Sequence, residues 1–152
     1  MPDERTYREE SPAVQAHLGI AQSVIQRMAA NSASCKAWCI TLVAAILVIV
    51  ADKGQPAYAL ICAVPTLLFL VLDTYYLALE KCFRDSYNEF IDKIHEGRVV
   101  VADLYAINPK GSLPISFARS LRSFSIWPFY VTLGLMIWLS MCIIIPCARD
   151  HR

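Results

Sequence analysis

The side chains best suited to chemistry are cations that lie between two apolar stretches of the chain. Five of them could hold phosphate groups, namely Lys93, Arg98, Lys110, Arg119 and Arg122. Tyr105 and Phe117 lie in the same stretch, and aromatic rings among basic residues suit phosphates joined to stacked bases. The alternative is that these cations only set membrane topology and contact anionic lipids. Composition leaves both interpretations open.

The sequence offers no arrangement typical of an enzyme, a metal site or a cofactor site. Its six cysteines are scattered, with no two separated by two residues, at Cys35, Cys39, Cys62, Cys82, Cys142 and Cys147. The three histidines are mutually isolated, and no nucleophile has an adjacent base. We therefore expect neither catalysis nor a bound metal or cofactor. We expect the cysteines to act mostly as small apolar packing residues.

The elements that must position the cations are apolar. The 152 residues are 57% hydrophobic, and the 14 basic and 13 acidic side chains avoid three windows, residues 37–51, 54–72 and 123–148. A membrane span needs roughly 20 apolar residues, so the first window must begin upstream, near Ser32, with Lys36 reaching outward to the headgroups. These windows predict an all-α integral membrane protein with three transmembrane helices.

The expected organisation has six segments. They are a disordered N-terminus (1–10), a cytoplasmic amphipathic helix (11–31), transmembrane helices over 32–51 and 54–79, a cytoplasmic connector (80–122) and a transmembrane helix over 123–148. Four basic residues lie on the N-terminal side of the first span, including Lys36 at its headgroup end, and seven lie in the connector, out of 14 in the chain. The positive-inside rule therefore predicts a cytoplasmic N-terminus and a C-terminus on the outer side.

A stripe of apolar and small residues follows the N-terminal region at alternating spacings of four and three. Ser11 is the expected N-cap, and Pro12 the first helical residue. The stripe comprises Val14, Leu18, Ala21, Ile25, Met28, Ser32, Cys35, Cys39, Leu42, Ile46 and Ile49. It predicts one long helix, continuous with the first span. In one interpretation this helix lies on the membrane surface or on the connector, and in the other it joins identical subunits. In the second case, Ser32, Cys35, Cys39 and Leu42 form the narrowest part of a pore.

The second span is expected to continue into the cytoplasm as a helix of about 40 residues that stops at Gly97. Its polar residues recur on one face, at Asp73, Tyr76, Glu80, Arg84 and Tyr87. Asp73 needs a partner near the membrane, and Glu80 and Arg84 suit an i,i+4 pair. This network either locks helices together or changes partners when the protein opens. Pro65 predicts a kink in mid-span.

Two segments carry a family resemblance. Residues 69–87 (FLVLDTYYLALEKCFRDSY) and 123–130 (SFSIWPFY) resemble the small bacterial multi-span membrane effectors of nucleotide-signalling anti-phage systems, closest to those of the Hailong system. The resemblance implies a homo-oligomeric ion channel, expected to be tetrameric, in the bacterial inner membrane. A nucleotide or oligonucleotide from a partner nucleotidyltransferase would control it from the cytoplasmic side, and opening would depolarise the cell.

Two other functions fit the same sequence. A non-conducting membrane anchor or scaffold would use the connector and the N-terminal helix without any pore. A membrane-disrupting toxin would act without a ligand and without fixed stoichiometry. No span carries a ring of carboxylates or a carbonyl-rich loop, so a pore would be weakly selective and gated by an apolar constriction.

Overall fold

The protein is an elongated bundle of helices, described over residues 10–144 in a computed structural model. Its elements are α1 (Pro12–Lys53), η1 (Pro56–Cys62), α2 (Ala63–His95), η2 (Val101–Asp103), α3 (Leu113–Leu121), α4 (Trp127–Leu139) and η3 (Ser140–Ile144). No strand occurs in this range, and the all-α prediction is confirmed. The predicted disordered terminus falls almost entirely outside the described residues, as do Cys147 and His151.

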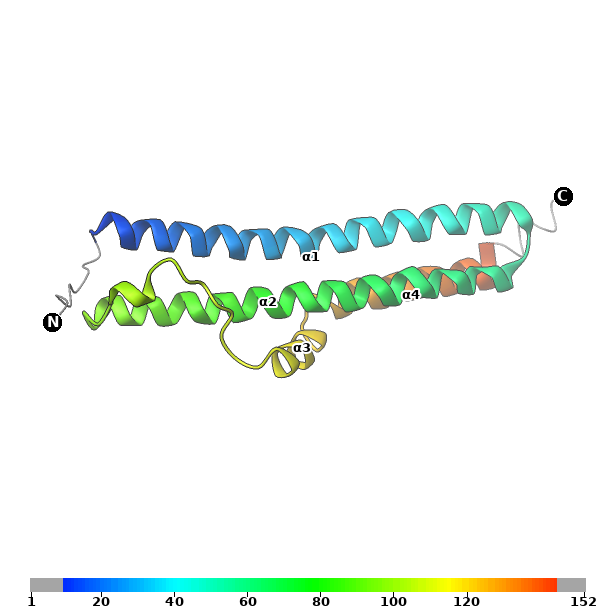
Figure 1. Cartoon of the computed structure of the whole chain (residues 1–152). Coiled ribbons are helices and arrows are strands. Elements are labelled where there is room, and N and C mark those ends of the chain that lie inside the picture. Colours follow the sequence, from blue (N-terminus) through cyan, green and yellow to red (C-terminus); the bar gives the residue numbers. More distant parts are fainter. Residues whose placement is uncertain (1–9, 145–152) are drawn as a thin grey trace.

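Helices α1 and α2 form a long antiparallel hairpin (Figure 1). The 42-residue α1 begins after the N-cap Ser11, with Pro12 in its first turn. It ends at Gly54, whose φ of 63° lies in the left-handed region, and the Gly54 N–H donates to the Ala51 carbonyl at 3.2 Å. Glycine adopts this conformation without the steric penalty of a Cβ atom. The single helix therefore continues from the N-terminal region to the tight turn.

The second arm of the hairpin changes its winding near Cys62. Residues Pro56–Cys62 form the 3₁₀-helix η1, and α2 starts at Ala63. Pro65 therefore lies in the first turn of an α-helix, where its missing N–H has no helical partner to lose. The structure places Pro65 at the start of α2, and the kink there stays a prediction. Gly97 follows the end of α2 with φ of 66°, as the expected stop requires.

The connector holds a helix that the sequence analysis did not predict. Helix α3 begins after Ser112, and Pro114 occupies its first turn instead of breaking the chain. The third apolar window also begins later than expected, because residues 123–126 form a turn in which the Ile126 N–H donates to the Ser123 carbonyl at 3.0 Å. Its described apolar helix, Trp127–Cys142, is shorter than a full span. The third transmembrane helix stays a prediction.

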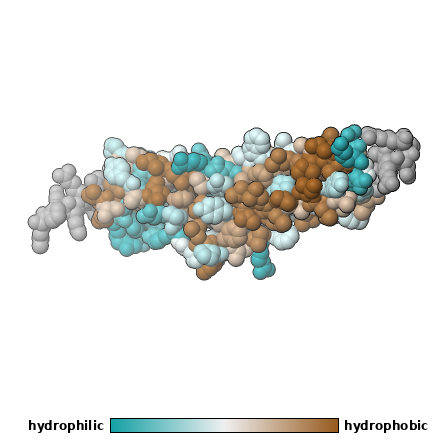
Figure 2. Space-filling model, turned by 45° about the vertical axis from the view of Figure 1, so that its right-hand side comes forward, coloured by the Kyte–Doolittle hydropathy of each residue, from teal (hydrophilic) through white to brown (hydrophobic). Residues whose placement is uncertain are grey.

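Within residues 10–144, two helices are long and apolar enough to cross a membrane, namely α1 and the η1–α2 arm. In each arm only 22% of the most apolar 18-residue window is buried within the chain. A core helix of a water-soluble protein buries most of such a window, because exposed apolar surface costs about 25 cal/mol per Å². Figure 2 shows hydrophobic surface over one half of the molecule and more hydrophilic surface over the other. The chain is therefore suited to associate with a membrane through its apolar half.

Each half of the hairpin has its own core. In the apolar half, α4 lies beside α1 and α2, with Tyr130 and Leu133 in one cluster with Cys39 and Val43. Met141 packs near Val50 at the turn, so α4 runs from the middle of the molecule toward the tight turn. In the polar half, a second cluster comprises Val14, Phe90, Ile94, Val99 and Leu104. It fastens the segment after α2 onto both helices.

Replacing Phe90 by Ala should loosen the polar half alone. Deleting a buried phenyl group costs about 3–5 kcal/mol. We expect amide exchange over residues 99–105 to accelerate by about tenfold or more in hydrogen–deuterium exchange, because local opening becomes cheaper. Ile20→Ala, at an exposed position of α1, is the control and should stay within about twofold of wild type. Unchanged protection in F90A would contradict the role given to this cluster.

Candidate functional site

Two polar sites lie on the α1–α2 hairpin. The first, here called the boundary pair, is the ion pair of Lys36 on α1 with Asp73 on α2. The second, here called the strap pocket, lies under residues 99–110, which cross the polar end of the hairpin as a strap. The same two helices form both sites, about 30 Å apart at 1.5 Å per residue.

The boundary pair is a buried ion pair between the two long helices. Asp73 is 0% exposed, and the Lys36 Nζ lies 2.6 Å from its Oδ2 and 2.8 Å from its Oδ1. The Ser32 hydroxyl also donates to Oδ1. Asp73 therefore has the partner that its burial requires. Lys36 turns inward to this carboxylate, so the predicted outward reach of Lys36 to the headgroups is wrong.

The pair lies about one hydrocarbon thickness from the tight turn. Lys36 precedes the end of α1 by 17 residues, which is about 25 Å of helix. Asp73 follows the same turn at a similar depth on the other arm, through η1 and the first part of α2. Since the hydrocarbon layer is about 30 Å thick, the pair lies near its edge when the turn lies at the opposite edge.

A third helix reaches the boundary pair. Tyr130 of α4 is buried, and its hydroxyl lies close enough to Asp73 to be affected by the carboxylate charge. Within the described residues, its contact with this carboxylate falls short of full hydrogen-bond geometry. A small shift of α4 would let it donate to Asp73. The buried carboxylate is therefore a point at which α1, α2 and α4 can be coupled.

The other members of the predicted polar network make separate contacts. Glu80 and Arg84 form the expected i,i+4 ion pair, with Nη2 to Oε1 at 2.8 Å. The Tyr87 hydroxyl accepts a hydrogen bond from Gln22 of α1 at 3.2 Å. Tyr76 contacts the ring of Tyr75 edge-on, with centroids 5.8 Å apart. The structure thus does not join these residues to Asp73 in one network.

The pore candidates lie mostly inside the single chain. Ser32, Cys35 and Cys39 are buried, and Cys39 belongs to the cluster with Tyr130 of α4. Leu42 is 43% exposed, because the buried stripe of α1 continues through Val43 instead. The stripe therefore packs α1 against helices of its own chain. The burial of Ser32, Cys35 and Cys39 within one chain takes them out of the predicted pore lining, agrees with a helix that lies on the connector, and leaves a seam between subunits as a prediction.

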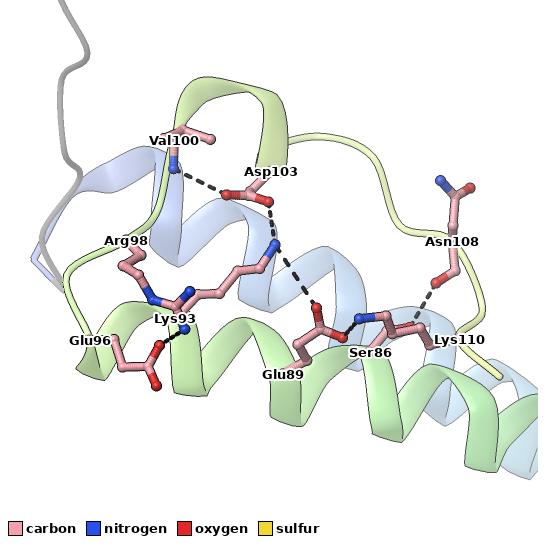
Figure 3. Close-up of polar contacts among 9 residues, drawn as sticks. All are labelled: Ser86, Glu89, Lys93, Glu96, Arg98, Val100, Asp103, Asn108 and Lys110. Atoms are coloured by element: carbon pink, nitrogen blue, oxygen red, sulfur yellow. Dashed lines mark hydrogen bonds and ion pairs between the residues drawn. The ribbon is translucent and has the colours of Figure 1, made fainter.

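The strap pocket is closed by ion pairs and hydrogen bonds (Figure 3). The Lys93 Nζ lies 2.6 Å from Asp103 Oδ1 and 4.0 Å from Glu89 Oε1, and Lys110 pairs with the same Glu89. The Ser86 hydroxyl donates to the Asn108 carbonyl at 2.7 Å. The half-open pocket between these groups has a volume of about 270 Å³. Two lysines and two carboxylates thus converge on one small polar cavity.

His17 supports the strap from beneath. Its Nδ1 accepts the backbone N–H of Tyr105 at 3.2 Å, and its ring lies 4.2 Å from that of Phe90. Tyr105 has a φ of 67°, a strained value for a residue with a side chain. Burial lowers the pKa of His17, and the nearby Asp103 opposes this shift. The neutral imidazole therefore holds a strained backbone in place.

The five predicted ligand cations fall into different places. Lys93 and Lys110 line the strap pocket, whereas Arg98 pairs with Glu96 outside its lining. Arg119 lies on α3 and Arg122 directly after it, both exposed and away from that lining. Sequence reasoning missed the partners that these sites need: His17, Lys36, Glu89, Asp103 and Tyr130. Only the pairing of Lys36 with Asp73 could have been predicted, because these two residues lie at similar distances from the predicted turn.

No family model matches this chain, and no curated protein or solved structure matches it significantly. Among the described residues, no group of three His, Cys, Asp or Glu side chains could hold a metal ion. The candidate sites are therefore defined by their geometry alone.

Replacing Lys36 by Met should destabilise the hairpin by about 3–5 kcal/mol, because it leaves the Asp73 carboxylate buried and unpaired. The double variant K36M/D73L should recover most of this loss. Thermal unfolding of the protein in detergent measures both. Arg84→Gln, which breaks the more exposed Glu80 pair, should cost at most about 1 kcal/mol. Equal losses in K36M and R84Q would show that the boundary pair has no special role.

The strap should loosen in mild acid. His17 binds a proton more readily when the strap is open than when the strap buries it. Its contribution to the stability of the closed strap is therefore present above the ordinary pKa of 6.5 and is lost as the pH falls below that value. A hydrogen bond from Lys93 lowers the pKa of Asp103 from 3.8, so that carboxylate titrates in a separate, more acidic range. Exchange of the Tyr105 amide, corrected for its intrinsic pH dependence, should rise between pH 7 and 5. His17→Gln should remove this rise; the same profile in H17Q would exclude His17.

Proposed function

We propose that the chain is a subunit of a homo-oligomeric ion channel, gated from the cytoplasmic side by an anionic ligand. One observation supports this most directly: α1 and α2 extend without interruption from the strap pocket past the boundary pair into the apolar half. Rigid helices transmit a displacement along their length. A ligand that moves the polar ends of this hairpin would therefore act on its membrane ends.

The strap pocket is the proposed ligand site. Both of its lysines already pair with Glu89, and Lys93 pairs also with Asp103. A phosphate group would have to replace one of these carboxylates. Binding would therefore break an ion pair that holds the strap. Tyr105 is exposed at the rim and offers a ring for a stacked base. Ligand binding and strap movement would thus be one event.

The identity of the ligand and the biological setting rest on the family resemblance. The proposed ligand is a nucleotide or oligonucleotide made by a partner nucleotidyltransferase. The proposed location is the bacterial inner membrane, with the N-terminus inside, and the proposed effect is depolarisation during phage infection. The proposed assembly is a tetramer. The boundary pair and the polar residues of α2 would change partners when the channel opens, and Tyr130 supplies an unused donor beside Asp73.

A pore between subunits must be lined by side chains that are exposed in the single chain. Leu42 is the exposed member of the four pore candidates, and it lies on α1 about two turns from Lys36 toward the tight turn. An apolar ring of this kind gates by excluding water. We therefore place the constriction at Leu42, with Ser32, Cys35 and Cys39 behind it as packing residues.

A membrane scaffold is the second candidate, and the use of the α1 stripe within one chain favours it. The polar half would then bind a cytoplasmic protein, and no current would flow. Ligand-independent dye leakage from liposomes would instead support a membrane-disrupting toxin. The same flux experiment separates the three functions.

Purified protein in liposomes should conduct ions in a manner that responds to short oligonucleotides. Lys110→Glu should weaken oligonucleotide binding by about tenfold or more, because a charge-assisted bond is worth about 1.5–3 kcal/mol. Arg98→Glu, outside the pocket lining, is the matched control and should bind as wild type.

Leu42→Ser should raise the current, while Leu68→Ser on the exposed face of α2 should not. No ligand-responsive flux in wild type would refute the channel, and equal binding by K110E and R98E would move the ligand elsewhere.

A further inference from the structure

The outer face of α3 carries one apolar and two basic side chains. Ile115, Arg119 and Arg122 follow one another at spacings of four and three, so they share a face, and all three are exposed. Ile115 is 63% exposed. The face that meets α2 carries small polar residues instead: Ser116 accepts a hydrogen bond from the Cys82 thiol at 3.4 Å, and Ser120 is fully buried.

The two arginines are free to bind an anion. Within the described residues, neither Arg119 nor Arg122 makes an ion pair, whereas Lys93, Arg98 and Lys110 of the same connector are all paired with carboxylates. An anion that meets Arg119 and Arg122 displaces no carboxylate. They thus differ from the lysines of the strap pocket.

Aromatic side chains continue the same surface toward α4. Phe124 is 89% exposed and Trp127 is 54% exposed, in the turn and at the helix start that follow α3. Tyr130, one turn further along α4, lies beside Asp73 of the boundary pair. Phe124 and Trp127 are therefore within about 10 Å of the level at which the hydrocarbon layer ends. Aromatic rings and arginines at this level are typical of contact with lipid headgroups.

We propose that α3 and the turn up to Trp127 form a binding site for anionic phospholipids. Arg119 and Arg122 bind the headgroup phosphates, while Ile115 and Phe124 enter the interfacial layer. This assignment takes both arginines out of the oligonucleotide site and does not depend on channel activity. The lipid holds the start of α4 at a fixed depth.

The test measures phosphatidylglycerol binding to the full chain in an uncharged detergent, by native mass spectrometry. Arg119→Gln/Arg122→Gln should weaken it about 30-fold, since each basic residue contributes about 1 kcal/mol near anionic lipid. Arg27→Gln/Lys81→Gln removes the same charge from other surfaces and should stay within about threefold of wild type. Phosphatidylcholine binding should be unchanged by either pair, and Phe124→Ser should weaken retention of both lipids. Inorganic phosphate should not displace the bound phosphatidylglycerol.

Helical circular dichroism verifies that each variant folds. Should the glutamine pair fail to fold, Arg119→Lys/Arg122→Lys keeps the charge and should bind within about threefold of wild type. Binding to wild type should also weaken as salt rises. Wild-type affinity in the folded glutamine pair, an equal loss in R27Q/K81Q, displacement by inorganic phosphate, or salt-independent binding would each overturn the proposal. A glutamine pair that lost oligonucleotide binding but kept the lipid would return the arginines to the ligand site.

Discussion

The fold depends on one buried ion pair, between Lys36 and Asp73. A carboxylate taken out of water without a counter-charge costs several kcal/mol, and breaking a buried pair leaves such a charge behind. The apolar contacts on either side are less demanding, because leucine, isoleucine and valine side chains tolerate a sliding neighbour. The pair therefore sets the register of α1 against α2. A slip of one helical turn would separate the charges by about 5 Å.

That register determines the geometry of the distant strap pocket. His17 lies 19 residues before Lys36, and Phe90 lies 17 residues after Asp73, so the antiparallel pairing brings the two rings to 4.2 Å. Tyr105 then finds the His17 imidazole where its strained backbone needs an acceptor. A structure fixed at the membrane boundary thus positions a polar site about 30 Å away. The same coupling in reverse is what a gating ligand requires.

Local features were predictable from the sequence, whereas contacts between residues far apart in the sequence were not. The start of α1 at Ser11 and Pro12, the stop at Gly97 and the Glu80–Arg84 pair all follow from neighbouring residues, and the structure has them. The stripe through Ser32, Cys35 and Cys39 was recognised as an apolar face, yet its sequence cannot tell whether a second copy or α2 covers it. Helix α3, which has Pro114 in its first turn, was missed for another reason: a proline that ends one element and a proline that starts another look the same without the backbone.

Helix α4 is the element whose position can change most easily. An apolar groove of about 460 Å³ runs along its contact with α1, lined by Ile40, Val43, Ala44 and Leu47 on one side and by Phe129 and Leu133 on the other. Moving α4 breaks no ion pair, because the boundary pair itself joins α1 and α2. Its buried Tyr130 hydroxyl gains a hydrogen bond if it approaches Asp73. A hairpin fixed by a buried ion pair, beside a third helix bordered by a groove, is the arrangement that the proposed channel needs for two states.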